Sequence, residues 1–129
     1  MITEDYCSYE VAKLLKEKGF DEPCKVWYSE YTSQFGGEKY TSIEFDDNNR
    51  FKKDYKFLFH APTHQMAMKW LRKIYGIDIV IEISDPSVKD RKYYCVIWNK
   101  NNDSYILDLF SSYEECVEAA LKYCLENLI

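Results

Sequence analysis

The chain has 129 residues, of which 47% are hydrophobic and 30% charged, and its formal net charge is −5 at pH 7. This length fits one folded unit, and the apolar content is too high for a wholly disordered chain. No apolar run approaches the roughly 20 residues that cross a bilayer, and the first residues lack the pattern of a signal peptide. We therefore expect one globular domain over residues 1–129, in the cytoplasm and without a membrane partner.

A first helix is predicted over residues 8–18, because apolar side chains recur there with helical spacing. The Ser8 hydroxyl can accept from N–H groups that the first turn leaves unpaired. Gly19 supplies the left-handed residue that ends such a helix. The side chains expected on its buried face are Val11, Ala12, Leu14 and Leu15.

Three strands are predicted next, over residues 24–31, 40–45 and 55–59. Their composition is rich in aromatic and β-branched residues, which favour extended chain. Gly36–Gly37 lies between the first two runs, as expected of a hairpin connection. The third run is short, and its alternation is the weakest of the three.

A second helix is predicted to start at Thr63, after Pro62, and to end at Gly76. Its apolar residues follow the spacing i, i+3, i+4, i+7 of a single helical face. The side chains expected on that face are Ala67, Trp70, Leu71 and Ile74.

The second half repeats this order. Residues 77–83 alternate between isoleucine and other residues, as expected of a strand with one buried face. Residues 93–98 are apolar on both faces and are therefore expected to form a central strand, joined by the polar turn 99–103 to a third strand over 105–109.

A final helix is predicted over residues 112–128. Ser112 and Glu115 have the spacing of a capping box, in which hydroxyl and carboxylate each accept from the other's backbone N–H. The expected buried side chains are Val117, Ala120, Leu121, Cys124 and Leu128. The chain is thus predicted to be an α+β protein of order αβββ-αβββ-α, with a possible internal duplication of residues 8–59 and 63–110.

Four segments carry a resemblance to a known group of proteins: Asp21–Cys24, Ala61–Arg72, Ser112–Glu115 and Ala119–Leu125. The chain resembles short uncharacterised proteins encoded by prophages and mobile elements of Bacteroides-type gut bacteria. The resemblance covers nearly the whole chain except Phe35–Arg50. It implies a bacterial cytoplasm and a phage-related setting, and it transfers no functional residue.

Metal and catalytic sites have little support in the sequence. His60 and His64 are four residues apart, but Pro62 separates them and the helix begins only after it, so they are interpreted as solvated loop histidines. The five cysteines form no CxxC pair and are expected to be reduced, mostly buried thiols. No phosphate-binding glycine loop, nucleophile elbow or HExxH motif occurs. We expect no enzyme activity, no cofactor and no metal.

A protein-binding function is favoured by the aromatic content of 12 tyrosines, seven phenylalanines and three tryptophans. A core of this size is not expected to bury so many rings, and exposed tyrosine is common at interfaces. An exposed strand edge also suggests pairing with a second copy, as a homodimer. The predicted interface residues are Tyr28, Tyr31, Tyr40, Tyr93 and Tyr94.

The alternative is nucleic-acid binding, because the net charge is +6 over residues 50–100, between acidic segments of −6 and −5. The order from Thr63 onward is also that of double-stranded RNA binding domains, but Glu114 and Glu115 would repel phosphates at the start of the last helix. Nucleic acid therefore ranks below protein as a partner. The residues of this predicted basic patch are Lys52, Lys53, Lys56, Lys69, Arg72, Lys73, Arg91 and Lys92.

Overall fold

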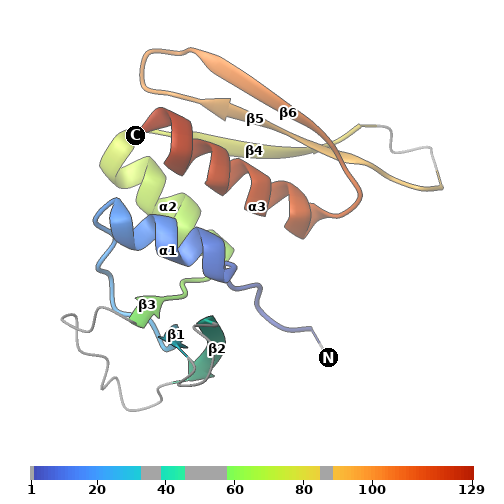
Figure 1. The fold of residues 1–129 in the computed structure, drawn as a ribbon. Coiled ribbons are helices and arrows are strands. Elements are labelled where there is room, and N and C mark those ends of the chain that lie inside the picture. The colour runs from blue at the N-terminus through green and yellow to red at the C-terminus, as the bar shows by residue number, and fades with distance from the viewer. Residues whose placement is uncertain (1, 33–38, 46–57, 85–88) are drawn as a thin grey trace. The chain divides into compact units, whose positions relative to one another are not determined.

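The computed structural model describes residues 2–32, 39–45, 58–84 and 89–129, with residues 29–32, 39–45 and 58 described by their backbone alone. Along the chain the elements follow the predicted order, from α1 to α3 (Figure 1). They form two compact units. The N-terminal unit comprises residues 6–63, and the C-terminal unit comprises residues 64–129 together with residues 1–5.

In the N-terminal unit, α1 covers Tyr9–Glu17. The Ser8 hydroxyl accepts from the Val11 N–H at 3.2 Å, which confirms the predicted cap. Gly19 has a φ of +94°, and the N–H of Phe20 donates to the Leu15 carbonyl at 2.9 Å. This left-handed residue ends the helix as predicted, because its conformation carries no side-chain strain in glycine.

The sheet of this unit has the strand order β2-β1-β3, with antiparallel pairing throughout. Strand β1 covers Val26–Thr32, β2 covers Lys39–Phe45 and β3 covers Leu58–His60. The ring of Tyr9 on α1 meets Tyr28 and Phe59 edge-on, with centroids 5.8 and 5.6 Å away. Helix α1 is thereby packed on this sheet. The predicted turn at Gly36–Gly37 lies outside the described residues.

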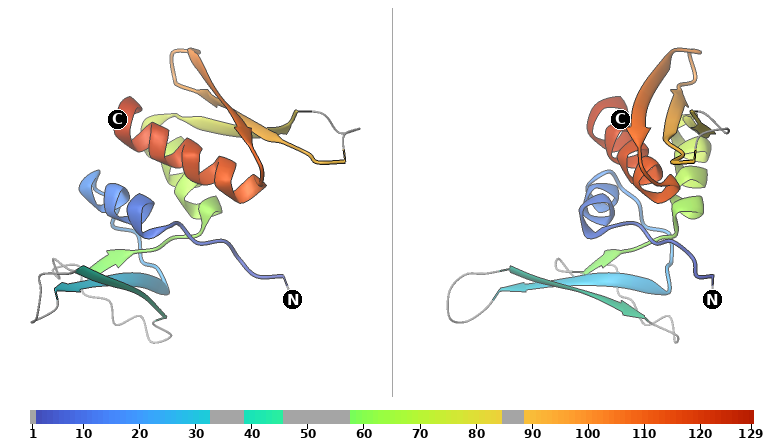
Figure 2. Two further views of the ribbon diagram at one scale, coloured as in Figure 1. Left: turned by 45° about the vertical axis from the view of Figure 1, so that its right-hand side comes forward. Right: turned by 90° about the vertical axis from the view of Figure 1, so that its right-hand side faces the viewer.

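In the C-terminal unit, α2 covers His64–Tyr75, and α3 covers Tyr113–Tyr123 and continues as the π-helix η1 over Cys124–Leu128. Strands β4 (Asp78–Ile83), β5 (Tyr93–Trp98) and β6 (Ser104–Phe110) form an antiparallel meander of order β4-β5-β6. Helix α3 packs on all three strands, and α2 packs on β4 and α3 (Figure 2). The prediction that residues 93–98 form a central strand is confirmed.

The two sheets differ in topology, so the suggested internal duplication is not confirmed. In the N-terminal sheet the first strand, β1, is central, whereas in the C-terminal sheet the second strand, β5, is central. A duplicated unit would place equivalent strands in equivalent positions. The shared order of one helix and three strands is therefore the extent of the similarity.

Two local predictions need correction. Ile74 was expected on the buried face of α2, but its side chain is 60% exposed, and His64 and Met68 are buried instead. At the start of α3, Ser112 accepts from the Glu115 N–H at 3.1 Å as predicted. The Glu115 carboxylate, however, accepts from the hydroxyl of Ser111 at 2.7 Å instead of from the Ser112 N–H.

Within the part of the chain that the structure describes, every helix falls short of the length and apolar content required to traverse a bilayer.

Candidate functional site

The sheet of the C-terminal unit has one face covered by α3 and a second face that we call the outer sheet face. Tyr93 contacts the ring of Tyr113 on α3, and Tyr105 contacts Tyr123. Side chains alternate along a strand, so the residues between these positions point the other way. The strand residues of the outer sheet face are Asp78, Val80, Glu82, Tyr94, Val96, Trp98, Ser104, Ile106 and Asp108.

An apolar row crosses the middle of the outer sheet face. Val80 on β4 pairs with Val96 on β5, and Val96 pairs with Ile106 on β6. Val80 is 40% exposed and Ile106 is 64% exposed, and Trp98, two residues along β5 from Val96, is 42% exposed. Three strands therefore present a continuous apolar strip to solvent, bordered by the ring of Trp98.

The charged residues at strand positions of the outer sheet face are all acidic. Asp78 pairs with Trp98 at one end of the face, while Glu82 and Asp108 lie towards the other end. All three side chains are exposed. Just outside β5, the exposed Lys92 lies two residues before Tyr94, where its carbonyl accepts from the Ser84 N–H, and it adds one cation to this border. The face thus combines an apolar centre with a border that is mainly acidic, and it attracts groups that are both apolar and cationic.

The five predicted interface tyrosines occupy different environments. Tyr94 lies on the outer sheet face and is half-buried, whereas Tyr93 lies on the opposite face against α3. The Tyr28 hydroxyl donates to the Cys7 carbonyl at 2.9 Å, which gives it a role within the N-terminal unit. The side chains of Tyr31 and Tyr40 lie outside the described residues.

The predicted basic patch is described only in part. Lys69, Arg72 and Lys73 are exposed on α2, a helix that contains no acidic residue. Arg91 and Lys92 are exposed in the segment that leads into β5. Lys52, Lys53 and Lys56 lie outside the described residues. Where the structure describes it, the basic character is thus strongest on one exposed face of α2.

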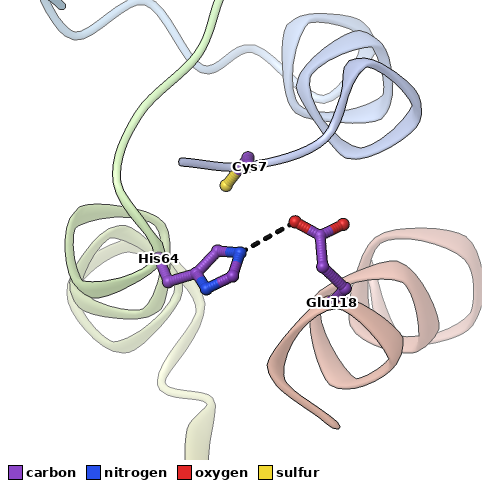
Figure 3. A group of neighbouring side chains, drawn as sticks. All are labelled: Cys7, His64 and Glu118. Atoms are coloured by element: carbon purple, nitrogen blue, oxygen red, sulfur yellow. Dashed lines mark hydrogen bonds and ion pairs between the residues drawn. The ribbon is translucent and has the colours of Figure 1, made fainter. Parts of the chain in front are cut away.

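A partly buried ionisable pair joins the two helices of the C-terminal unit. The Nε2 atom of His64 lies 2.8 Å from Oε1 of Glu118, with the His64 side chain 8% and the Glu118 side chain 27% exposed (Figure 3). The backbone N–H of His64 donates to the Asp5 carbonyl at 2.9 Å. Cys7, also labelled in Figure 3, belongs to the N-terminal unit, where its N–H donates to the Pro62 carbonyl.

The interpretation of His64 as a solvated loop histidine is wrong, because its side chain is buried against a carboxylate. An ionised carboxylate only accepts hydrogen bonds, so the proton of this bond lies on Nε2. A carboxylate that fixes the imidazole tautomer is the arrangement of a general base and of many histidine metal ligands. That the chain has no enzyme activity therefore stays a prediction.

Sequence reasoning missed Glu118, although a signal for it exists. Leu121 and Leu125 follow it at i+3 and i+7, so the carboxylate lies on the apolar side of α3 and needs a partner there. The partner is 54 residues away along the chain. The spacing of residues within one helix therefore indicates that Glu118 needs a hydrogen-bond partner, but it does not identify that partner.

Burial lowers the reactivity of most of the cysteine thiols by raising their pKa. Burial raises the pKa of Cys116 and of Cys124 to about 12, and the nearby Cys95 thiol contributes to both shifts. Burial, assisted by the charge of Glu22, also raises the pKa of Cys24 to about 12. All five cysteines are free and buried, which confirms the prediction of reduced, mostly buried thiols. The thiols of Cys24, Cys116 and Cys124 therefore act as small apolar groups rather than as nucleophiles.

We expect thiol reagents to modify Cys24, Cys116 and Cys124 very slowly in the folded protein. At pH 8 a thiol with a pKa of about 12 is ionised to about one part in ten thousand. Mass spectrometry of peptides labelled by an aromatic disulfide reagent should show rates at least roughly a hundredfold below those in urea. An Asn101→Cys variant, in an exposed turn, is the control, and equal labelling of any of the three native thiols would contradict this account.

Comparison of the chain with protein-family models, with curated proteins and with solved structures finds no match.

Proposed function

We propose that the chain is a small protein-interaction module whose C-terminal unit binds another protein through the outer sheet face. The observation that carries this proposal is the exposed row of Val80, Val96 and Ile106 beside Trp98. Contiguous exposed apolar strips of this kind mark interaction sites. Burial of the exposed part of such side chains contributes on the order of 1 kcal/mol each to a complex.

The composition of the outer sheet face supports this function. Tryptophan is enriched among residues that dominate binding energy, and Trp98 lies at the edge of the apolar row. The carboxylates at the border remain hydrated until a partner supplies cations, which favours specificity over indiscriminate apolar contact. In line with the sequence resemblance, we place the module in a bacterial cytoplasm and in a phage-related setting.

The test compares variants of one surface. The wild-type chain, an Ile106→Lys variant and an Asn101→Lys control are used as baits in nuclease-treated bacterial lysate, and captured proteins are then purified and titrated against each bait. We expect Ile106→Lys to weaken the interaction by about tenfold or more, because a lysine cannot be buried in the apolar row without a partner. Asn101→Lys adds the same charge in an exposed turn and should bind like the wild type.

Binding that Ile106→Lys leaves unchanged would contradict the proposal.

Nucleic acid is the second candidate partner, and the exposed triad Lys69, Arg72 and Lys73 on α2 favours it. In a parallel capture from lysate without nuclease treatment, nucleic-acid binding would appear as capture that added nuclease removes and that falls steeply with salt.

A further inference from the structure

The exposed side of α2 carries positive charges, which the strands of the outer sheet face lack. Lys69, Arg72 and Lys73 are exposed, and α2 contains no acidic residue. Met66 is 39% exposed. These four residues recur with helical spacing on one side of α2 and form what we call the basic helix face. It combines cations with an apolar side chain, whereas the outer sheet face combines carboxylates with an apolar row.

We infer that the outer sheet face binds the basic helix face of a second copy of this chain. This inference rests on the proposed function and names the partner. Helices commonly cover the apolar face of a sheet, and in this unit α3 covers one face. In the assembly, α2 of the second copy covers the other face.

The dimensions of the two surfaces agree. Helix α2 has 12 residues and is therefore about 18 Å long. Strands β4, β5 and β6 have six or seven residues and are therefore about 20 Å long. The three strands offer on the order of 300 Å² for contact, which is well below the area of stable complexes. The association is thus expected to be weak and dependent on concentration.

Two symmetric modes of self-association are disfavoured by the same surfaces. Two outer sheet faces packed on each other would bring Asp78, Glu82 and Asp108 of both copies together, and like charges in a contact oppose it. Pairing along the edge of β6 meets a bulge, because two residues of β6, Asp108 and Leu109, lie opposite Tyr94 on β5. Bulges at sheet edges hinder further strand pairing.

A helix-on-sheet contact joins two different surfaces and is therefore heterologous. Each copy can donate one helix and accept one helix. Growth then continues from copy to copy unless a ring closes. Because its charges lie near solvent, the contact should weaken as salt increases.

The test is sedimentation velocity of the full chain from low micromolar to millimolar concentration, at low and at high salt. We expect the mass to rise with concentration at low salt and to return to that of the monomer at high salt. An Ile106→Lys variant and a Lys69→Glu/Lys73→Glu variant should each remain monomeric. Lys25→Glu, an exposed charge reversal in the N-terminal unit, should behave like the wild type.

Mixing the two variants separates this contact from the alternatives. The Ile106→Lys chain retains an intact helix and the Lys69→Glu/Lys73→Glu chain retains an intact sheet, so the mixture should form dimers that grow no further. Self-association of the Lys69→Glu/Lys73→Glu chain by itself would overturn the inference in favour of contact between sheets. A wild-type chain that stays monomeric would also overturn it.

These outcomes are distinguishable from failure of the proposed function. A monomeric wild type that still captures a protein, with capture lost in Ile106→Lys, supports the outer sheet face as a binding site and rejects a second copy as its occupant. Far-ultraviolet circular dichroism checks that each variant is folded. Val80→Lys, on the opposite edge of the apolar row, repeats the test should Ile106→Lys fail to fold.

Discussion

Replacement of Leu121 by alanine is expected to lower the free energy of unfolding of the C-terminal unit by about 2–5 kcal/mol. The Leu121 side chain has no exposed surface, and it lies on the face of α3 that packs on α2 and the sheet. Removal of its branched end leaves a cavity that the surrounding side chains fill only in part. Because domains are stable by only about 5–15 kcal/mol, such a loss is a large share of the total.

Leu109→Ala is the matched control, because it makes the same chemical change at a side chain that is 63% exposed on β6. This substitution should lower the free energy of unfolding by less than about 1 kcal/mol. Urea unfolding followed by circular dichroism gives both values, and equal slopes in urea would show that both variants expose the same surface on unfolding. A loss at Leu109 as large as that at Leu121 would contradict the expectation that burial of the side chain determines the loss of stability.

The element order was predictable because each element has a periodic apolar pattern. The isoleucines of residues 77–83 and the apolar face of α1 are read from neighbouring residues, and the observed bounds lie close to the predicted ones. The order of strands in the N-terminal sheet was not predictable. Its central strand pairs with partners on both sides, and that choice depends on contacts between segments far apart in the chain.

The outer sheet face could be predicted only in part. Alternation identifies which residues of one strand share a face, but the row of Val80, Val96 and Ile106 depends on the register of two strand pairs. The exposure of Ile74 was missed for a related reason. It lies in the last turn of α2 with the spacing of the buried residues Ala67 and Trp70, but spacing within one helix does not show whether another element covers that turn.

The second large effect is expected at Glu118. Its replacement by alanine should lower the free energy of unfolding by about 1–3 kcal/mol, because the buried His64 ring loses the acceptor that its Nε2 proton requires. Glu118→Gln retains an oxygen acceptor at the same position and should cost less. Urea unfolding measures both changes. Proton NMR should show the hydrogen-bonded Nε2 proton of His64 in the wild type and in Glu118→Gln, and not in Glu118→Ala.

Glu126→Ala is the control, since Glu126 lies on the continuation of the same helix and its contact with Lys122, at 3.8 Å, is exposed. Exposed pairs of this spacing contribute only about 0.3–0.5 kcal/mol. The two variants remove the same carboxylate group from one helix, so the difference between their losses in free energy of unfolding isolates the effect of burial. Were Glu118→Ala to cost no more than Glu126→Ala, the His64–Glu118 contact would have no structural role.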